Sequence, residues 1–227
     1  MTSNSNPQSP AQILAVVGPT GSGKTALAIE LAEALNTEIV SADSMQFYRG
    51  LEIGTGAPSA AELSRVPHHF VGFLDPSESM SAGKFEALAR PVVDRLNADG
   101  KIAIVAGGSG LYIRALIDGL AATPSALESI RSELAERAAS EGVAALYAEL
   151  RAVDPIYADT IGDKDLRRIV RGLEVYTVTG KPFTDHHAEQ LSTSAPYRAK
   201  QVAIDWPREV LYERINARVD AMMAAGF

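Results

Sequence analysis

A phosphate-binding loop is the clearest chemical motif in this sequence. Residues 18–25 have the sequence GPTGSGKT, which fits the pattern G-x-x-x-x-G-K-[ST]. In such a loop the glycines allow backbone N–H groups to point at an anion, and the following helix adds the positive end of its dipole. Lys24 contributes a positive charge, and Thr25 contributes a hydroxyl that can bind Mg²⁺. We therefore predict a polyphosphate site here, with Thr25 as the metal ligand.

Two other segments could complete this site, because each follows a predicted buried strand. Asp43 follows residues 38–42, and Ser109 lies in a Gly-rich turn after residues 101–106. In open α/β sheets ligands bind beyond the carboxyl ends of the strands, so both side chains are expected near the phosphate loop. Asp43 could bind Mg²⁺, accept a proton from a substrate, or cap a turn. The turn at Ser109 could present its hydroxyl to the site or serve packing alone.

The segments around these residues predict an α/β fold. Strands are expected at residues 12–17, 38–42, 69–73, 101–106 and 200–205. Leu27, Leu31 and Leu35 mark one face of a helix that starts near Lys24. A second helix, capped by Ser81, is expected to carry Phe85, Leu88, Val92 and Leu96 on its apolar face and to kink or split at Pro91. Strands alternating with helices indicate a parallel sheet, P-loop NTPase-like, with flanking helices.

The second half of the chain has a different character. Residues 119–197 contain helical patterns around Leu134 and from Val143 to Leu150, with no strand run before Lys200. We therefore expect three parts: a disordered tail at residues 1–12, an α/β core at residues 13–118 and 198–227, and a helical insertion domain at residues 119–197.

One helix of this insertion is expected to have two unlike faces. Leu166, Ile169, Val170 and Leu173 form an apolar stripe with i, i+3, i+4, i+7 spacing. A second stripe with the same spacing, called here the cationic ridge, lies almost opposite at 100° per residue and consists of Lys164, Arg167, Arg168 and Arg171. The apolar stripe is expected to be buried, and the ridge either contacts an anion or is a solvated helix face.

Composition excludes several classes of protein. The 227 residues carry a net charge of −7 and include no cysteine, which rules out disulfides, thiolate chemistry and Cys-ligated zinc. Residues 151–200 alone are slightly basic, with 8 Lys or Arg against 7 Asp or Glu, so a polyanion site would have to be local. No signal peptide or membrane-spanning run is present, and a soluble, cytoplasmic protein is expected. The adjacent pairs His68-His69 and His186-His187 are expected to have structural or surface roles.

The motifs after the phosphate loop limit the reaction classes. A P-loop ATPase or GTPase commonly has an aspartate after the strand at residues 101–106, whereas this chain has glycine there. The Asn-Lys-x-Asp segment that recognises guanine is also missing, so a GTPase is disfavoured. A small-molecule kinase remains an alternative, because the same loop can hold ATP.

Taken together, the motifs closely resemble those of the tRNA dimethylallyltransferases. The resemblance rests on several separated segments in one order, which are residues 18–25, 41–56, 66–69, 107–112, 165–176 and 179–181. It implies that a dimethylallyl group is transferred from dimethylallyl diphosphate to the exocyclic amine of the adenosine 3′ of the tRNA anticodon, with Mg²⁺ as cofactor. The loop would hold the departing diphosphate through Gly18, Pro19, Thr20, Gly21, Ser22, Gly23, Lys24 and Thr25.

The same resemblance implies roles for individual residues. Asp43 matches the family's proposed base, and Lys24, Ser109 and Arg218 are the other expected catalytic residues, although Arg214 could take the place of Arg218. Contacts with tRNA are implied for Asp43, Ser44, Met45, Gln46, Ser109, Arg131, Arg167, Arg168, Ile169, Val170 and Arg171.

Two departures from the family pattern bear on these expectations. The family usually has Thr at the position of Ser109, a change that keeps the hydroxyl. The family also continues well past Phe227, which keeps a non-catalytic RNA- or nucleotide-binding module open as a third interpretation. The chain is expected to be a monomer.

Overall fold

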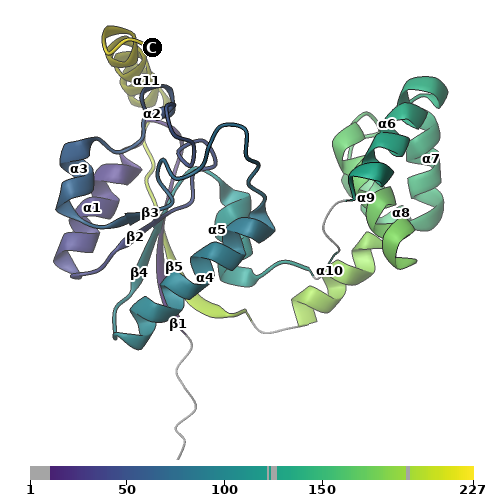
Figure 1. Ribbon diagram of the computed structural model, residues 1–227, viewed down its shortest axis with the longest axis horizontal. Helices are drawn as coiled ribbons and strands as arrows, with labels where there is room; N and C mark the ends of the chain where they lie inside the picture. Colours follow the sequence, from purple (N-terminus) through teal and green to yellow (C-terminus); the bar gives the residue numbers. More distant parts are fainter. Residues whose placement is uncertain (1–10, 122, 124–126, 193–194) are drawn as a thin grey trace, which may run out of the picture. The chain divides into compact units, whose positions relative to one another are not determined.

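The computed structural model describes residues 11–121, 123, 127–192 and 195–227. They form two compact units (Figure 1), which we call the sheet unit, made of residues up to Leu120 and Ala195–Phe227, and the helical unit, Ala121–Ser194. Of the tail predicted at residues 1–12, residues 1–10 lie outside the described residues. The last two, Ala11 and Gln12, belong to the first strand, so the prediction is wrong for them.

Within the described residues, the sheet unit is built on five parallel strands. These are β1 (Ala11–Val17), β2 (Ile39–Ser41), β3 (His68–His69), β4 (Ala103–Ala106) and β5 (Tyr197–Ala203), in the spatial order β3-β2-β4-β1-β5. Every residue of β2 and β4 is buried, as expected for central strands covered on both faces. The predicted α/β class is confirmed.

The strand register brings three loops to one edge of the sheet. Ala106 of β4 lies beside Val16 of β1 and also beside Ser41 of β2. The three strands therefore end at the same level, and the segments that begin at Gly18, Asp43 and Gly107 follow within two residues. This register is what gathers the predicted site residues.

Helices cover both faces of the sheet (Figure 1). One core cluster contains the buried side of α4 and α5, and another contains the buried side of α1. The helices of this unit are α1 (Lys24–Ala34), α2 (Glu52–Thr55), α3 (Ala60–Arg65), α4 (Ala82–Ala98), α5 (Gly110–Asp118) and α11 (Arg208–Ala224).

Two predicted helix faces differ from the observed ones. In α1 the buried residues are Ala28, Ile29 and Ala32, whereas Leu35 is exposed, because small residues let this helix pack closely on the sheet. In α4, Ser81 caps the helix as predicted, but Leu88 is exposed and Ala89 and Val93 are buried beside Phe85 and Leu96.

Pro91 does not split α4, which is continuous from Ala82 to Ala98. Proline removes a hydrogen-bond donor and fixes φ near its helical value, so a helix can pass through it when packing on both sides holds it. Ala89 and Val93, which flank Pro91, are both fully buried and supply that packing.

The predicted third strand is also displaced. A strand was expected at residues 69–73, but β3 is only His68–His69, and Phe70 has a φ of 66°. The chain turns there because its aromatic residues enter a cluster with Phe47, Phe85 and Tyr112, in which neighbouring ring centroids lie 5.3–5.7 Å apart. The apolar character of residues 70–73 therefore serves side-chain packing rather than strand pairing.

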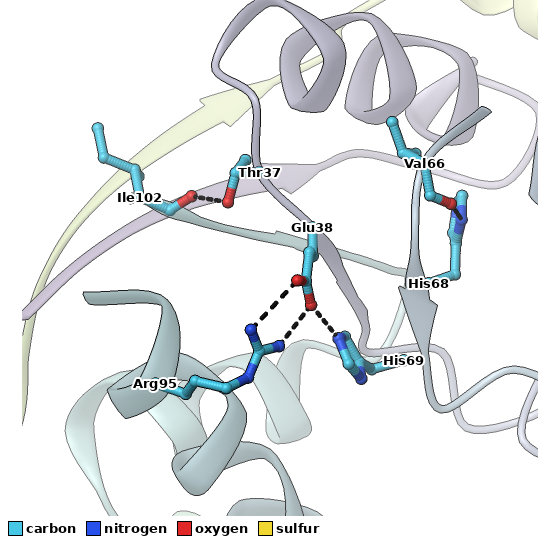
Figure 2. Close-up of polar contacts among 7 residues, drawn as sticks. All are labelled: Thr37, Glu38, Val66, His68, His69, Arg95 and Ile102. Carbon is cyan, nitrogen blue, oxygen red and sulfur yellow. Dashed lines mark hydrogen bonds and ion pairs between the residues drawn. The ribbon is translucent and has the colours of Figure 1, made fainter. Parts of the chain in front are cut away.

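A charged cluster ties β2, β3 and α4 together at the start of β2 (Figure 2). The Glu38 carboxylate accepts hydrogen bonds from Arg95 of α4 at 2.5 and 3.2 Å, and His69 Nε2 lies 2.6 Å from it. These contacts lower the pKa of Glu38 to about 2, mainly through the Arg95 hydrogen bond. Nearby, the Thr37 hydroxyl donates to the Ile102 carbonyl at 2.8 Å.

The helical unit has its own apolar core. Its helices are α6 (Glu128–Glu141), α7 (Val143–Val153), α8 (Pro155–Thr160), α9 (Leu166–Thr179) and α10 (Phe183–Ser192). The core residues are Leu134, Leu146, Leu150, Ala158, Ile169 and Leu173. Gly172 lets α9 approach its neighbours closely, since a Cβ there would lie 2.7 Å from Leu150 and 3.0 Å from Tyr157.

The buried carboxylate of Asp154 fixes two helix starts in this unit. It caps α8 by accepting from the Tyr157 amide at 3.0 Å, and it accepts from the amide and hydroxyl of Thr184 at 2.9 and 2.6 Å.

Among the described residues of the whole chain, no helix has the length and apolar content needed to cross a bilayer.

Candidate active site

The phosphate loop has the conformation that its sequence predicts. Gly18, Gly21 and Gly23 have φ values of 152°, 80° and 98°, a region that side-chain-bearing residues rarely adopt. The loop ends where α1 begins, at Lys24. Lys24 Nζ donates hydrogen bonds to the carbonyl oxygens of Gly18 at 3.0 Å and Pro19 at 2.8 Å, so the lysine closes over its own loop.

Residues from the end of the sheet unit bind two more carbonyl groups of the loop. Arg214 Nε donates to the Gly21 carbonyl at 2.8 Å, and Trp206 Nε1 donates to the Ser22 carbonyl at 2.9 Å. The Arg214 guanidinium lies 5.1 Å from the Trp206 ring centroid, within cation–π range. Trp206 lies 184 positions from Ser22, so no local sequence signal marks this contact. From the sequence alone, Trp206 is expected to be a packing residue at the start of the last helix.

The donors of the loop, in contrast, remain available. Within the described part of the chain, the amides of Gly21, Gly23 and Lys24 take part in no backbone hydrogen bond, and the buried Ser22 hydroxyl has no partner. The Thr25 hydroxyl, half-buried at the start of α1, also has no hydrogen bond to another described residue. Because most of its carbonyl oxygens are occupied while the Gly21, Gly23 and Lys24 amides are not, the loop is chemically suited to an anion.

Asp43 lies in a loop that is tied to the Gly-rich turn after β4. The Ser44 amide donates to the Ser109 hydroxyl at 2.9 Å, and that hydroxyl lies 3.1 Å from the Ser44 hydroxyl. The Ser109 amide donates to the Ala42 carbonyl at 3.1 Å. Asp43 itself accepts from the Met45 amide at 3.1 Å, which is the turn-capping contact considered from the sequence. Its other carboxylate oxygen lies close to Gly108.

A cavity of about 670 Å³ opens where these loops meet. Its polar lining comes from the phosphate loop and α1, β2 and the Asp43 loop, α2, β3 and α11. It includes Lys24, Thr25, Ser41, Asp43, Gln46, Thr55, His68, Arg214 and Arg218. Its apolar lining comprises Ala28, Ile39, Met45, Pro58, Ala106 and Ala217. The cavity therefore offers anion-binding groups beside an apolar wall.

Three charged groups act on one another inside this cavity. Burial lowers the pKa of Lys24, the negative charge of Asp43 opposes that shift, and the positive charge of Arg218 adds to it. Arg218 Nη2 donates to the Thr55 carbonyl at 2.9 Å and lies against Gly56, where a Cβ would be 2.2 Å away. Two of the arginines of α11 therefore reach the cavity, Arg214 at the loop and Arg218 at the end of α2.

Three residues predicted to contact tRNA differ in how they lie relative to the cavity. Ser109 is not part of its lining, because its hydroxyl binds Ser44 instead. Met45 lines it but is 53% exposed. Gln46 lines it and is held by hydrogen bonds to Gly56 at 3.2 Å and Ser41 at 3.3 Å.

His68 lies in the cavity wall, although the sequence analysis gave it only a structural role. Its Nδ1 donates to the Val66 carbonyl at 2.9 Å (Figure 2), which leaves Nε2 as the unprotonated nitrogen. Burial lowers the pKa of His68, so the ring is neutral near pH 7. The pairing of His68 with a backbone carbonyl depends on the tertiary turn at β3 and leaves no pattern in the sequence.

The cationic ridge belongs to the helical unit, on α9. Ile169 and Leu173 of the opposite stripe are buried, and Leu166 and Val170 are half-buried, as the spacing predicts. Lys164 precedes the helix, which begins at Leu166. The ridge is partly neutralised, because Arg168 pairs with Asp165 and Arg171 pairs with Glu174.

The geometry of the sheet unit defines a class of protein: an α/β phosphate-binding protein whose P-loop shares its cavity with a carboxylate and two arginines. A family model described as IPP transferase matches residues 46–227. A tRNA dimethylallyltransferase of Syntrophobacter fumaroxidans is 47% identical over 215 residues, and one of Geobacter sulfurreducens is 45% identical over 219. The chain belongs to the IPP transferase family, as its motifs predicted.

Solved structures of this family are also similar. The full-length tRNA isopentenylpyrophosphate transferase from Bacillus halodurans is 39% identical with a TM-score of 0.63, and the alignment covers 95% of this chain and 67% of that one. A eukaryotic dimethylallyltransferase acting on tRNA is 29% identical with a TM-score of 0.82, and the alignment covers 95% of this chain and 54% of that one.

The chain is shorter than its relatives. The matches above cover 95% and 96% of this chain but 63% of the Syntrophobacter protein and 70% of the Geobacter protein. The activity of these longer proteins is therefore applied to this chain only as a proposal.

Proposed function

We propose that this chain carries the diphosphate site and the base of an enzyme that transfers a dimethylallyl group from dimethylallyl diphosphate to an adenosine amine in tRNA. The observation that carries the proposal is the cavity in which the free amides of the phosphate loop, Asp43 and Arg218 meet an apolar wall. A diphosphate with a short apolar tail has matching chemistry. The names of the family's members support this choice of substrates.

In the proposed reaction the adenine amine attacks the allylic carbon of the isoprenoid. The bond between that carbon and the diphosphate oxygen breaks, and its electron pair stays on the diphosphate. Lys24, the loop amides and Arg218 stabilise the charge that gathers on this leaving group. Asp43 accepts the proton released from the amine nitrogen, a contribution of roughly 10²–10⁴ in rate when a base is well placed.

Ser109 has an indirect part in this mechanism. Its hydroxyl holds the Ser44 amide at 2.9 Å and its own amide holds the Ala42 carbonyl at 3.1 Å, so the residues on both sides of Asp43 are anchored to it. We therefore assign Ser109 the role of positioning Asp43 rather than that of contacting the leaving group.

The residues fit a Mg²⁺ ion that enters with the diphosphate. The half-buried Thr25 hydroxyl is available beside the loop amides, and Asp43 lines the same cavity. No three His, Cys, Asp or Glu side chains gather into a metal-binding group anywhere in the described residues, so most ligands would be diphosphate oxygens and water, which suits Mg²⁺. When bound, the ion would supply charge neutralisation at the leaving group.

For the helical unit we propose contacts with the tRNA backbone. Arg167 and Arg168 are exposed on α9, and the phosphates of an RNA stem match a row of guanidinium groups. Such contacts position the RNA without recognising its bases. With tRNA as substrate and no cysteine in the chain, we propose the cytoplasm as its location and a monomer as its form.

Incubation of the chain with unmodified tRNA, Mg²⁺ and labelled dimethylallyl diphosphate tests the proposal. The expected result is label in the RNA and release of diphosphate. Phosphate transfer from ATP, with weak binding of the allylic diphosphate, would instead identify a small-molecule kinase. Binding of both diphosphate and RNA without transfer would identify a non-catalytic binding module.

A further inference from the structure

The carboxylate of Glu174 lies at the centre of a charge cluster in the helical unit. Glu174 is only 1% exposed, although it is an acidic residue on α9. Arg131 of α6 places its Nε 3.1 Å from one carboxylate oxygen and its Nη2 3.4 Å from the other. Arg171, three residues earlier on α9, donates Nη1 to the carboxylate at 2.8 Å and Nη2 to the Thr123 hydroxyl at 2.8 Å. One carboxylate thus holds guanidinium groups from two helices.

The burial of this carboxylate is not explained by stability alone. Removing charges from water is costly, and a buried ion pair is often no more stabilising than apolar residues of the same volume. This unit has an apolar core that includes Leu134, Leu146 and Leu173. The charge cluster therefore points to a function for the arginines that Glu174 holds.

The cluster is open to solvent on the side of its arginines. The Arg131 side chain is 45% exposed and that of Arg171 is 28% exposed. Arg131 Nε lies 3.1 Å from Oε1 as an ion-pair contact without hydrogen-bond geometry, and Nη2 donates to Oε2 at 3.4 Å. The Nη1 group stays outside this contact, and an oriented guanidinium is suited to a phosphate.

The cluster is also continuous with the cationic ridge. At 100° per residue, Arg167, Arg171 and Glu174 fall within about 60° of the circumference of α9. Glu174 therefore lies along the same side of the helix as the ridge, and Arg131 covers it from α6. Glu174 fixes the Arg131 guanidinium beside the ridge through these contacts.

We propose that Glu174 is a positioning residue that joins Arg131 of α6 to the cationic ridge of α9 and orients both guanidinium groups toward RNA phosphates. This inference rests on the proposed function, because it takes tRNA as the source of those phosphates. The positioning role belongs to the Glu174 carboxylate. This carboxylate is itself negatively charged and does not bind the phosphate.

The variant Glu174→Gln distinguishes two effects of Glu174 on RNA binding: orientation of the two guanidinium groups, and the negative charge of the carboxylate. The substitution removes one negative charge from the surface that meets RNA, so charge alone would strengthen RNA binding or leave it unchanged. Positioning requires the opposite result, because a neutral amide cannot hold two guanidinium groups. We expect binding of an anticodon stem-loop RNA, measured by fluorescence anisotropy, to weaken about tenfold, with dimethylallyl diphosphate binding unchanged.

Glu149→Gln is the matched control. Glu149 of α7 pairs with Arg137 of α6 at 2.7 Å, in the same unit but outside the cluster. The control makes the same change in charge and also breaks an ion pair to α6. It should bind RNA as tightly as the unsubstituted chain or slightly more tightly.

Arg131→Lys keeps the inference testable if Glu174→Gln does not fold. Arg131 is nearly half exposed and lysine keeps its charge, so this variant should fold, but it loses the planar fork and should also weaken RNA binding. Normal RNA affinity in folded Glu174→Gln, or in Arg131→Lys, would overturn the positioning role. Failure of the unsubstituted chain to bind RNA would instead overturn the proposed function.

Discussion

The Ser44 amide donates a 2.9 Å hydrogen bond to the hydroxyl of Ser109, across 65 residues of sequence. This bond joins the loop after β2 to the loop after β4. The two loops are already in close contact, because Gly107 lies against the Ala42 backbone, where a Cβ would be 2.2 Å from the carbonyl oxygen. Asp43, between Ala42 and Ser44, is therefore anchored on both sides.

The first prediction concerns Ser109→Ala. Loss of the hydroxyl leaves the Ser44 amide without its acceptor, which should cost about 1 kcal/mol in the free energy of unfolding. Because Asp43 is then held less firmly, we expect the transfer rate to fall by about tenfold, at unchanged diphosphate affinity. Single-turnover kinetics and urea unfolding measure the two effects. Ser109→Thr keeps the hydroxyl and should keep most of the rate, and equal rates in both variants would contradict the positioning role.

Asp43→Asn tests the proposed base. The amide keeps the size of the side chain but accepts no proton, so transfer should fall by roughly 10²–10⁴. Diphosphate binding, measured by calorimetry with Mg²⁺ present, should stay within about twofold, since the loop amides and Lys24 carry it. A collapse of diphosphate affinity in this variant would show that Asp43 is needed as a metal ligand.

Arg214 and Arg218 of α11 should differ in what they contribute. Arg218 acts electrostatically on Lys24, whereas Arg214 donates to the Gly21 carbonyl and stacks on Trp206. We therefore expect Arg218→Gln to lower the transfer rate by about 10²-fold through loss of leaving-group stabilisation. Arg214→Gln should mainly loosen the loop and weaken diphosphate binding. If Arg214→Gln instead lowers kcat and Arg218→Gln instead weakens diphosphate binding, the two arginines have the opposite roles.

Features set by local sequence could be predicted in this protein. The strand before the phosphate loop, the start of α1 at Lys24, the Ser81 cap and the apolar stripe of α9 each depend on neighbouring residues and appear as predicted. Asp43 was placed at the cavity because it follows a central strand, and parallel strands end at a common edge.

Features set by distant contacts could not be predicted. Residues 70–73 are apolar because Phe70 and Phe73 pack against Phe47, and periodicity does not separate that role from strand pairing. The contact of Trp206 with the Ser22 carbonyl joins residues 184 positions apart. The buried Glu174 pairs with Arg131 from another helix. The sequence of α9 shows its row of basic residues but not this pairing.

The ridge gives a prediction about salt dependence. Arg167 is exposed, and among the described residues it has no ion-pair partner, so its charge is available to an RNA phosphate. Arg167→Gln should weaken RNA binding for all sequences alike and reduce the slope of log affinity against log salt by about 1. Arg151→Gln, which removes an exposed arginine paired with Asp159 at 3.7 Å on the same unit, is the control. An unchanged slope in Arg167→Gln would exclude this residue from the RNA contact.

The Glu38 cluster predicts how stability depends on pH. The pKa of Glu38 is about 2 in the folded chain, below its ordinary value of 4.5, chiefly because Arg95 donates to its carboxylate. A lowered folded pKa stabilises the fold above pH 4.5, and this contribution is lost as the pH falls from 4.5 toward 2. Its size should be about 1 kcal/mol, because water screens a pair in which the Arg95 side chain is 48% exposed. Urea unfolding at pH 7 and pH 3 should show a smaller loss of stability in Glu38→Gln than in the unsubstituted chain, and Arg95→Gln should show the same reduction. A loss of equal size in all three proteins would mean that other carboxylates set the acid sensitivity of the fold.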